Sequence, residues 1–454
     1  MKRAIQSTLC LALMALAFAA MPSCAADKLV WRGGERVDAD IDGWSLTQLL
    51  ENLAEATGWQ VFVEPGARLK EPISVKFSNL ASGAALGRML GDLSFAVLPQ
   101  SRAPAKLFVF RTSVGDATQR VERREPLKPK PIADELILLR KPGSTESAEE
   151  LAKRLGGRVT GRFDQFGAYR LKFKDEDAAR QAITELNGQR DFELDYNYPV
   201  PRLVAAEPLA ASSTLPLNLK PDASAPAGQL RVGLIDAAVQ RNSPYNEFLL
   251  PGVSVAGEAT LGNASPTHGT SMFETVLRGL ATTQDKDATT SVRVLPVDVY
   301  GDSENTSTYN VALGIAEALN AGATVINLSL ASNGDSQLLH NVIIKGAERG
   351  VLFIAAAGNE PTTLPSFPAA YPEVLAVTAG GKTGLASYAN RGDFVDVIAP
   401  GSSIIHFGGR TYYVSGTSAS TAYMTGLAAG MKASTGASAA ALTGKLVEVF
   451  GVKK

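Results

Sequence analysis

The spacing of apolar residues changes along the chain, and the first regular pattern has them three and four positions apart. They stand at Leu46, Leu49, Leu50, Leu53 and Ala54. This is the spacing of one face of an amphipathic helix. Ser45 and Gln48 predict a capping box at the start of this helix, and Gly58 predicts its end.

The residues that follow alternate between strand and helix patterns. Apolar Val61 and Val63 come first, and apolar and polar residues then alternate at 73–77, which predicts strands. Helical spacing returns at 86–93, and an apolar run at 107–110 predicts a closing strand. We therefore predict a small α+β domain over residues 29–112.

A second small unit is predicted at residues 132–200, after a polar segment at 113–131 that contains several Pro, Lys and Arg residues. Such a composition favours a solvated, extended linker over a basic binding site. The unit itself shows patterns for a strand at 135–140, a helix at 147–155, a strand at 168–173, a helix at 176–186 and a strand at 192–196. Residues 201–228 are rich in Pro, Ala and Ser without a period, and predict an exposed connector.

From residue 229 to 454, short β-branched runs alternate with helical patterns. The runs lie at 231–235, 293–297, 324–329, 351–356 and 374–378. They suit strands that are buried on both faces, and the stretches at 309–320 and 338–348 suit helices that cross over a parallel sheet. We predict a doubly wound, mainly parallel α/β sheet, in which functional groups gather at the carboxyl ends of the strands.

Length and charge narrow the classes of function. A chain of 454 residues exceeds what one hydrophobic core usually organises, which agrees with several domains. The formal net charge of −1 gives no attraction to polyanions and argues against a nucleic-acid partner.

The first residues predict a signal peptide over 1–25. Lys2 and Arg3 precede an apolar run at 9–20, and small residues up to Ala25 suit a cleavage site. The protein is therefore expected to be exported, to the periplasm or the medium. No later segment approaches the ~20 apolar residues of a membrane-spanning helix.

Both cysteines, Cys10 and Cys24, lie in this leader, so we expect no internal disulfide in the mature chain. A lipidated Cys24 is the second interpretation. It ranks lower because residues 21–23 match a lipoprotein cleavage sequence poorly.

Four candidate chemical residues stand at element boundaries of the third unit. Asp236 ends a buried strand pattern, and His268 follows 268 − 236 = 32 residues later, before a helical pattern. Asn359 follows Gly358 after another strand, and Ser418 precedes a helix of small residues. Each one alone has a plain structural interpretation, such as a turn, a packed histidine or a tightly buried helix.

Taken together, these residues follow the Asp, His, Ser chain order of the subtilisin triad. The chain also contains THGT, AAAGNE, GTSAS, VINLSL, YPEVLAV and VIAPG. With these motifs the third unit resembles the subtilase family of serine proteases over nearly all of residues 229–435. The resemblance implies a secreted serine endopeptidase, made as a precursor, that hydrolyses peptide bonds in protein or peptide substrates.

The family pattern assigns roles to the candidate residues. His268 would be the general base for the nucleophile Ser418, Asp236 would orient the imidazole, and Asn359 would be the oxyanion donor. These roles require the imidazole of His268 to contact both a carboxylate and a hydroxyl.

Three further residues match the family's substrate-binding segment. Ser329 and Leu330 would pair with the substrate backbone as an added strand, and Ala331 would begin the wall of the first specificity pocket.

The two smaller units also resemble known domains. Residues 132–200, which open with ELIL and end with FELDYNY, resemble a subtilase prodomain, which implies a folding aid and inhibitor whose terminal segment leaves through the active-site cleft. Self-cleavage is then expected in or near the connector after Tyr198. The first domain resembles the short N-terminal domain of secretins and TonB-dependent transducers, which implies a partner in the cell envelope; any other compact α+β module is the alternative.

The chain departs from the family pattern at several positions. Ala237 and Ala238 replace the usual Thr-Gly or Ser-Gly after the aspartate. Ser271 and Tyr423 each stand where the family usually has a histidine, and Ala331 stands where it usually has a glycine. None removes a reacting group, but added methyl groups would narrow the substrate range or slow turnover.

These departures motivate one alternative, a catalytically silent envelope scaffold that binds peptides or a secretin-like partner. A third, narrower possibility is a protease whose only substrate is itself. No organic cofactor is required by the implied chemistry and no metal ligands are assigned. No acidic cluster matches the family's strong calcium loop, so calcium stays an open alternative.

Overall fold

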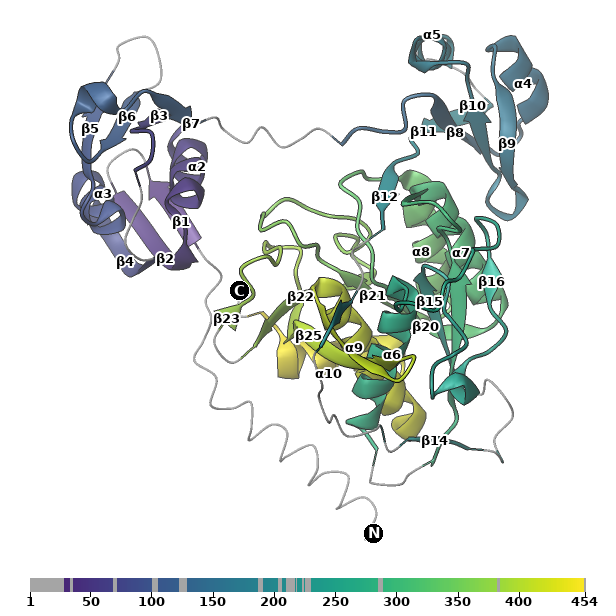
Figure 1. The fold of residues 1–454 in the computed structure, drawn as a ribbon. Helices are drawn as coiled ribbons and strands as arrows, with labels where there is room; N and C mark the ends of the chain where they lie inside the picture. Colours follow the sequence, from purple (N-terminus) through teal and green to yellow (C-terminus); the bar gives the residue numbers. More distant parts are fainter. Residues whose placement is uncertain are drawn as a thin grey trace. The chain divides into compact units, whose positions relative to one another are not determined.

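The computed structural model describes residues 28–32, 36–67, 72–99, 105–121, 129–186, 191–202, 206–209, 217, 219–222, 224, 230–284, 289–381 and 384–452. They form two compact bodies, one up to residue 121 and the other from residue 129 onward (Figure 1). The second body contains the second and the third of the predicted units. The predicted signal peptide and Cys24 lie outside the described residues. Within the described part of the chain, no helix is long and apolar enough to cross a membrane.

The first unit places two helices against two antiparallel or mixed sheets. One sheet has the order β1 (Lys28–Arg32), β2 (Arg36–Trp44), β4 (Ile73–Ala81), and the other has β5 (Ser94–Leu98), β6 (Lys106–Phe110), β3 (Gln60–Val63), β7 (Gln119–Val121). The helices are α2 (Leu46–Thr57) and α3 (Ser82–Leu90). Helix α2 buries the predicted apolar face, Ser45 caps it by accepting from the Gln48 N–H, and Gly58 ends it at φ 74°.

Two expectations for this unit are corrected. Helix α3 ends at Leu90, and Leu93 lies beyond it, because Gly91 leaves the helical conformation at φ 59°. The predicted linker contains a short helical turn and strand β7, which pairs with β3; Val121 packs against the core of the unit. Residues 119–121 are therefore an edge strand of the sheet, held by backbone pairing with β3 and by the apolar contact of Val121.

The second small unit is an antiparallel sheet with two helices. Its strand order is β11 (Phe192–Asp195), β8 (Glu135–Arg140), β10 (Ala168–Lys172), β9 (Arg158–Phe163). The helices α4 (Ala148–Arg154) and α5 (Glu176–Leu186) match the predicted ones, and a capping box at Ser147 begins α4. Strand β9 was not predicted because glycines and arginines hide its alternation.

The third unit is built on a doubly wound parallel sheet, as predicted. Its main order is β16 (Val253–Ser254), β18 (Val292–Asp298), β15 (Leu230–Asp236), β20 (Ala323–Leu328), β21 (Leu352–Ala356), β22 (Val374–Gly381), β23 (Gly384–Leu385), with β24 (Val397–Pro400) also on β22. The pairs are parallel except for β22 with β23. Successive side chains of β15 enter different cores, because Leu234 packs with one helix pair and Ile235 with the other.

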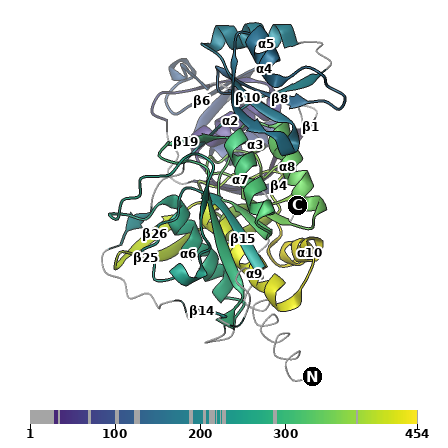
Figure 2. The ribbon, with the colours of Figure 1, turned by 90° about the vertical axis from the view of Figure 1, so that its right-hand side faces the viewer.

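Helices α6 (His268–Ala281) and α9 (Thr417–Thr435) line one core, and α7 (Thr308–Asn320) and α8 (Gln337–Glu348) line the other. A further helix, α10 (Ala439–Phe450), packs near α9 and β24. In both views the sheet of the second small unit lies over α7 and α8 (Figures 1 and 2).

The described parts of the predicted connector are not simply exposed. Strand β12 (Pro199–Pro201) pairs with β19 (Asn305–Ser307), β13 (Glu207–Pro208) pairs with β26 (Arg410–Ser415), and β14 (Lys220–Pro221) pairs with β17 (Thr289–Thr290). Backbone pairing needs no apolar period, which is why composition alone missed these strands.

Glycines let α6 and α9 approach each other closely. A Cβ atom at Gly426 would lie 1.9 Å from the Val276 carbonyl oxygen, and one at Gly279 would lie 2.0 Å from that of Tyr423. Backbone atoms cannot move aside as a flexible side chain can, so both positions require glycine.

We expect Gly426→Ala to destabilise the protein by about 1–3 kcal/mol, because the added methyl group overpacks this contact. Gly444→Ala is the matched control, since Gly444 lies in α10, where an added Cβ atom would meet nothing within 4 Å. Thermal unfolding measures both variants. Equal melting temperatures for the two would contradict the packing argument.

Candidate active site

The four candidate residues lie at the carboxyl ends of strands or at the start of helices. Asp236 is the last residue of β15, and His268 is the first residue of α6. Asn359 follows β21 by three residues, and Ser418 is the second residue of α9. Loops at this edge of a parallel sheet converge, which explains how residues far apart in the sequence meet.

Asp236 and His268 are in direct contact. His268 Nδ1 lies 2.7 Å from Asp236 Oδ1, and the two residues are only 2% (Asp236) and 9% (His268) exposed. Since a carboxylate accepts, Nδ1 carries the proton and Nε2 is left as the acceptor.

The start of α6 is fastened to the loop after Asp236. Thr267 donates its hydroxyl to the Ala238 carbonyl at 2.6 Å and caps the helix by accepting from the Thr270 N–H. A Cβ atom at Gly269 would lie 1.9 Å from the Ala237 carbonyl oxygen. Glycine after the histidine is therefore what allows the ring to reach the carboxylate.

Asp236 keeps one oxygen unsatisfied. Oδ1 also accepts from the Ala237 N–H at 2.7 Å, whereas Oδ2 is buried without a hydrogen-bond partner among the described residues. Serine or threonine at position 237, the residues expected from the family pattern, would carry a hydroxyl beside this carboxylate. With alanine at position 237, Asp236 Oδ2 stays buried without a hydrogen bond, which lowers the stability of the folded state.

Ser418 is tied to the residue that follows β20. Its hydroxyl donates to the Ser329 carbonyl at 3.2 Å, and the Ser329 hydroxyl donates to the Ser418 carbonyl at 3.0 Å. Asn327 donates to the Ser329 hydroxyl at 3.0 Å and accepts from Thr425 at 3.0 Å. This buried network fixes the backbone of the serine.

The structure brings the imidazole to the carboxylate but leaves the serine hydroxyl on the Ser329 carbonyl. A serine hydroxyl rotates to whichever acceptor is free, and such contacts often tighten only when substrate is bound. Helices α6 and α9, which carry His268 and Ser418, pack directly on each other.

Asn359 is oriented by two donors. Its Oδ1 accepts from the Thr417 backbone N–H at 2.9 Å and from the Thr417 hydroxyl at 3.0 Å. Because both partners donate, the side-chain NH₂ group points elsewhere; a Cβ atom at Gly416 would lie 3.1 Å from Nδ2. The Ser418 N–H belongs to the first turn of α9, where backbone N–H groups have no intrahelical acceptor.

The predicted substrate-binding residues adjoin this site. Ser329 is buried, Leu330 packs in the core under α7 and α8, and Ala331 is partly exposed. The strand that follows the second small unit, β12, pairs with β19 and not with residues 329–331. Close to those residues, the Ser332 hydroxyl donates to the Pro199 carbonyl at 3.2 Å.

The end of the second small unit caps both helices α7 and α8. Asp195 accepts from the Ser336 hydroxyl and the Leu338 N–H, each at 2.9 Å. Asn197 accepts from the Tyr309 N–H at 3.1 Å. Burial raises the pKa of the Asp195 carboxyl, and the hydrogen bonds at the helix start oppose that change.

A family model described as the subtilase family matches residues 194–446, more than half of the chain, and one described as the fervidolysin N-terminal prodomain matches residues 121–196. The chain belongs to the subtilase family. A subtilase prodomain therefore precedes the catalytic domain. The catalytic domain is a serine protease domain of α/β fold. The likeness of the first domain to secretin and TonB-associated domains stays a prediction.

Similar subtilases include two with curated names. The thermophilic serine proteinase of Bacillus sp. (strain AK1) is 31% identical over 207 residues, 44% of this chain and 51% of that protein. Thermitase of Thermoactinomyces vulgaris is 34% identical over 224 residues, 46% of this chain and 76% of that protein. The chain thus spans about half the length of the first and three quarters of the second.

Among solved structures, the protease domain of PatA is similar, with 26% identity and a TM-score of 0.40 over 45% of this chain and 79% of that one.

Subtilases commonly bind calcium, an ion that needs several oxygen ligands gathered in one place. The described residues contain no group of three or more His, Cys, Asp or Glu side chains that could hold a metal ion. Backbone and amide oxygens also bind calcium, so calcium stays an open alternative, and no step below involves a metal.

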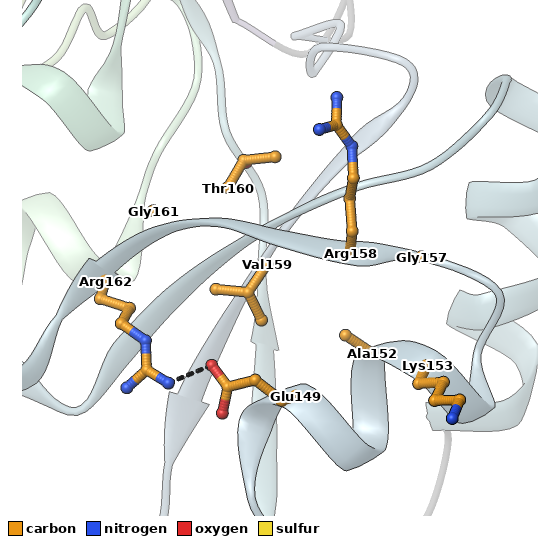
Figure 3. Close-up of a pocket in the computed structure, with 9 residues that line it drawn as sticks. All are labelled: Glu149, Ala152, Lys153, Gly157, Arg158, Val159, Thr160, Gly161 and Arg162. Atoms are coloured by element: carbon orange, nitrogen blue, oxygen red, sulfur yellow. Dashed lines mark hydrogen bonds and ion pairs between the residues drawn. The ribbon is translucent and has the colours of Figure 1, made fainter.

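A hollow of about 560 Å³ lies in the prodomain, apart from the catalytic residues. It is lined by residues of α4 and of strand β9, and an ion pair joins Glu149 to Arg162 across it (Figure 3). Its charged lining on an edge strand carries no reacting group.

Sequence reasoning missed Thr417, which orients Asn359, and the short strand β19. Thr417 lies inside the GTSAS motif and could have been found there. Strand β19 is three polar residues, Asn305–Ser307, with no apolar alternation to reveal it.

We expect Ala237→Ser to raise the free energy of unfolding by about 1 kcal/mol, because a hydroxyl at this position supplies a donor for the unsatisfied Asp236 Oδ2. Chemical denaturation measures the change. Ala238→Ser serves as the control, since the side chain of Ala238 is partly exposed. A gain from the control as large as that from Ala237→Ser would overturn the explanation.

Proposed function

We propose that this subtilase is an exported serine endopeptidase in which Asp236, His268 and Ser418 form the catalytic triad and Asn359 donates to the oxyanion. The observation that carries the proposal is the buried 2.7 Å contact between His268 and Asp236, because His268 lies on α6, which packs directly against α9, the helix that carries Ser418. The substrates are proteins or peptides.

In the proposed reaction, His268 Nε2 takes the proton of the Ser418 hydroxyl as Oγ attacks the peptide carbonyl. The same proton passes to the leaving amine when the peptide bond breaks and an acyl ester remains on Oγ. Water then attacks the ester, gives a proton to His268, and releases the acid and the serine hydroxyl. Asp236 stabilises the imidazolium in both halves, and no organic cofactor is required.

The negative charge of the tetrahedral intermediate requires donors. The Asn359 NH₂ group and the Ser418 N–H supply two, the first held by Thr417 and the second by the helix start. Loss of one such donor lowers kcat by about 100- to 1000-fold, a range that comes from subtilisin itself.

The proposed precursor is inhibited by its prodomain and cuts itself. Supporting this, residues 199–202 are held along β19, and residues 207–209 are held along β26, which leads into Ser418 through Ser415. The chain is thus paired with the catalytic domain on both sides of residues 203–205, which lie outside the described residues.

We further propose export by the leader at residues 1–25 into the periplasm or the medium, with lipidation of Cys24 as the less favoured anchor. The first domain is a separate unit and is proposed to contact a partner in the cell envelope.

A second candidate is a peptide-binding scaffold without catalysis. Two observations favour it. The Ser418 hydroxyl donates to the Ser329 carbonyl, and the Asp236 Oδ2 atom lacks a donor among the described residues.

A fluorophosphonate probe separates the two candidates. We expect it to label the processed protein and to fail on Ser418→Ala, since only an activated serine reacts. Ser434→Ala, an exposed serine on the same helix, should be labelled like the unaltered protein. Absence of labelling in the unaltered, processed protein would favour the scaffold.

N-terminal sequencing of the mature protein tests the self-cleavage. We expect a new N-terminus between residues 203 and 207, and an uncleaved precursor in Ser418→Ala. Hydrolysis of added casein by the mature protein distinguishes a general protease from one that cuts only itself. A mature N-terminus upstream of Tyr198 would contradict the anchoring argument.

A further inference from the structure

The prodomain's terminal strand pairs with the catalytic domain and shows which side chains the surface beside β19 accepts. Strand β12 pairs with β19 in antiparallel register, Val200 opposite Thr306. The pairing continues beyond the strand, because the Arg202 N–H donates to the Glu304 carbonyl at 2.8 Å. Main-chain pairing of this kind gives affinity without sequence preference, so selectivity must come from the side chains.

Two side chains of this strand meet contrasting surroundings. Val200 is 1% exposed and belongs to the apolar cluster that contains Tyr300 and Leu330. Arg202, two positions on and therefore on the same side of an extended chain, forms an ion pair with the Glu304 side chain. The surface beside β19 offers an apolar cluster followed by a carboxylate.

The residues around Glu304 strengthen this pattern. Tyr300 donates its hydroxyl to the Pro201 carbonyl at 3.2 Å, which fixes the strand between Val200 and Arg202. The pKa of Asp302 is lowered, first by hydrogen bonds from Thr260 and also by the positive charge of Arg202.

We infer that Glu304 is a specificity-determining residue, and that this protease selects extended substrates with a basic residue two positions after an apolar one. The inference rests on the proposed protease function and deepens it. An acidic substrate residue at the same place would meet the carboxylate of Glu304 and be disfavoured.

The expected preference is modest because the Glu304 side chain is 79% exposed and the Arg202 side chain 28% exposed. Exposed ion pairs are screened by water and salt, so we expect about a two- to fivefold advantage in kcat/KM for Arg over Gln. The preference should shrink as salt concentration rises.

Peptides that copy residues 196–209 of this chain, with Arg, Gln or Glu at position 202, test the preference on the processed enzyme. The ratio of kcat/KM for the Arg and Gln peptides should fall to near one in Glu304→Gln and invert in Glu304→Lys. Glu317→Gln, an exposed acid on α7, is the matched control and should keep the ratio of the unaltered enzyme. An unchanged ratio in Glu304→Gln and Glu304→Lys would overturn the inference.

Self-processing gives a second test through charge reversal. Arg202→Glu and Glu304→Arg should each slow conversion of the precursor, and the double variant should restore it towards the original rate. A double variant no faster than the slower single one would also overturn the inference. If the unaltered enzyme cleaves no peptide and takes up no fluorophosphonate, the protease proposal itself has failed, a result distinct from cleavage that ignores Glu304.

Discussion

The contact between His268 and Asp236 depends on two backbone segments meeting with no side chain between them. Gly269 lies against the Ala237 carbonyl, where any Cβ atom would lie within 1.9 Å of the oxygen. The same requirement recurs where α6 meets α9 at Gly426. The first approach brings the imidazole to its carboxylate, and the second brings α6 beside α9, which carries Ser418. The geometry of the site therefore follows from close packing at glycines.

The prodomain binds the catalytic domain through hydrogen bonds to helix starts and through strand pairing. It supplies acceptors to the starts of α7 and α8, through Asn197 and Asp195, and then continues as a strand along β19. Helix starts expose unpaired N–H groups, so capping them from another domain favours the bound state. Ile137 and Phe163 of the prodomain share a buried cluster with the catalytic domain.

Much of the fold followed from local pattern. The strands that end at Asp236 and Ala356 are continuous apolar runs, and the helix from Leu46 shows a single apolar face. Strands β9, β12, β13 and β19 escaped prediction, because they are short, polar or rich in Gly and Pro and exist through pairing with a partner strand. Leu93 was assigned to a helix that Gly91 ends.

The family could be recognised from the sequence alone, and Asp236, His268, Asn359 and Ser418 could be singled out as candidate residues, because motifs and periodicity within short segments carry this information. Only the tertiary structure decided that the serine hydroxyl donates to Ser329, that Asp236 keeps an unsatisfied oxygen, and that Glu304 meets Arg202. Each of these features depends on residues distant in the chain. They arise from the distances and free hydrogen-bonding groups that packing creates, which no local pattern encodes.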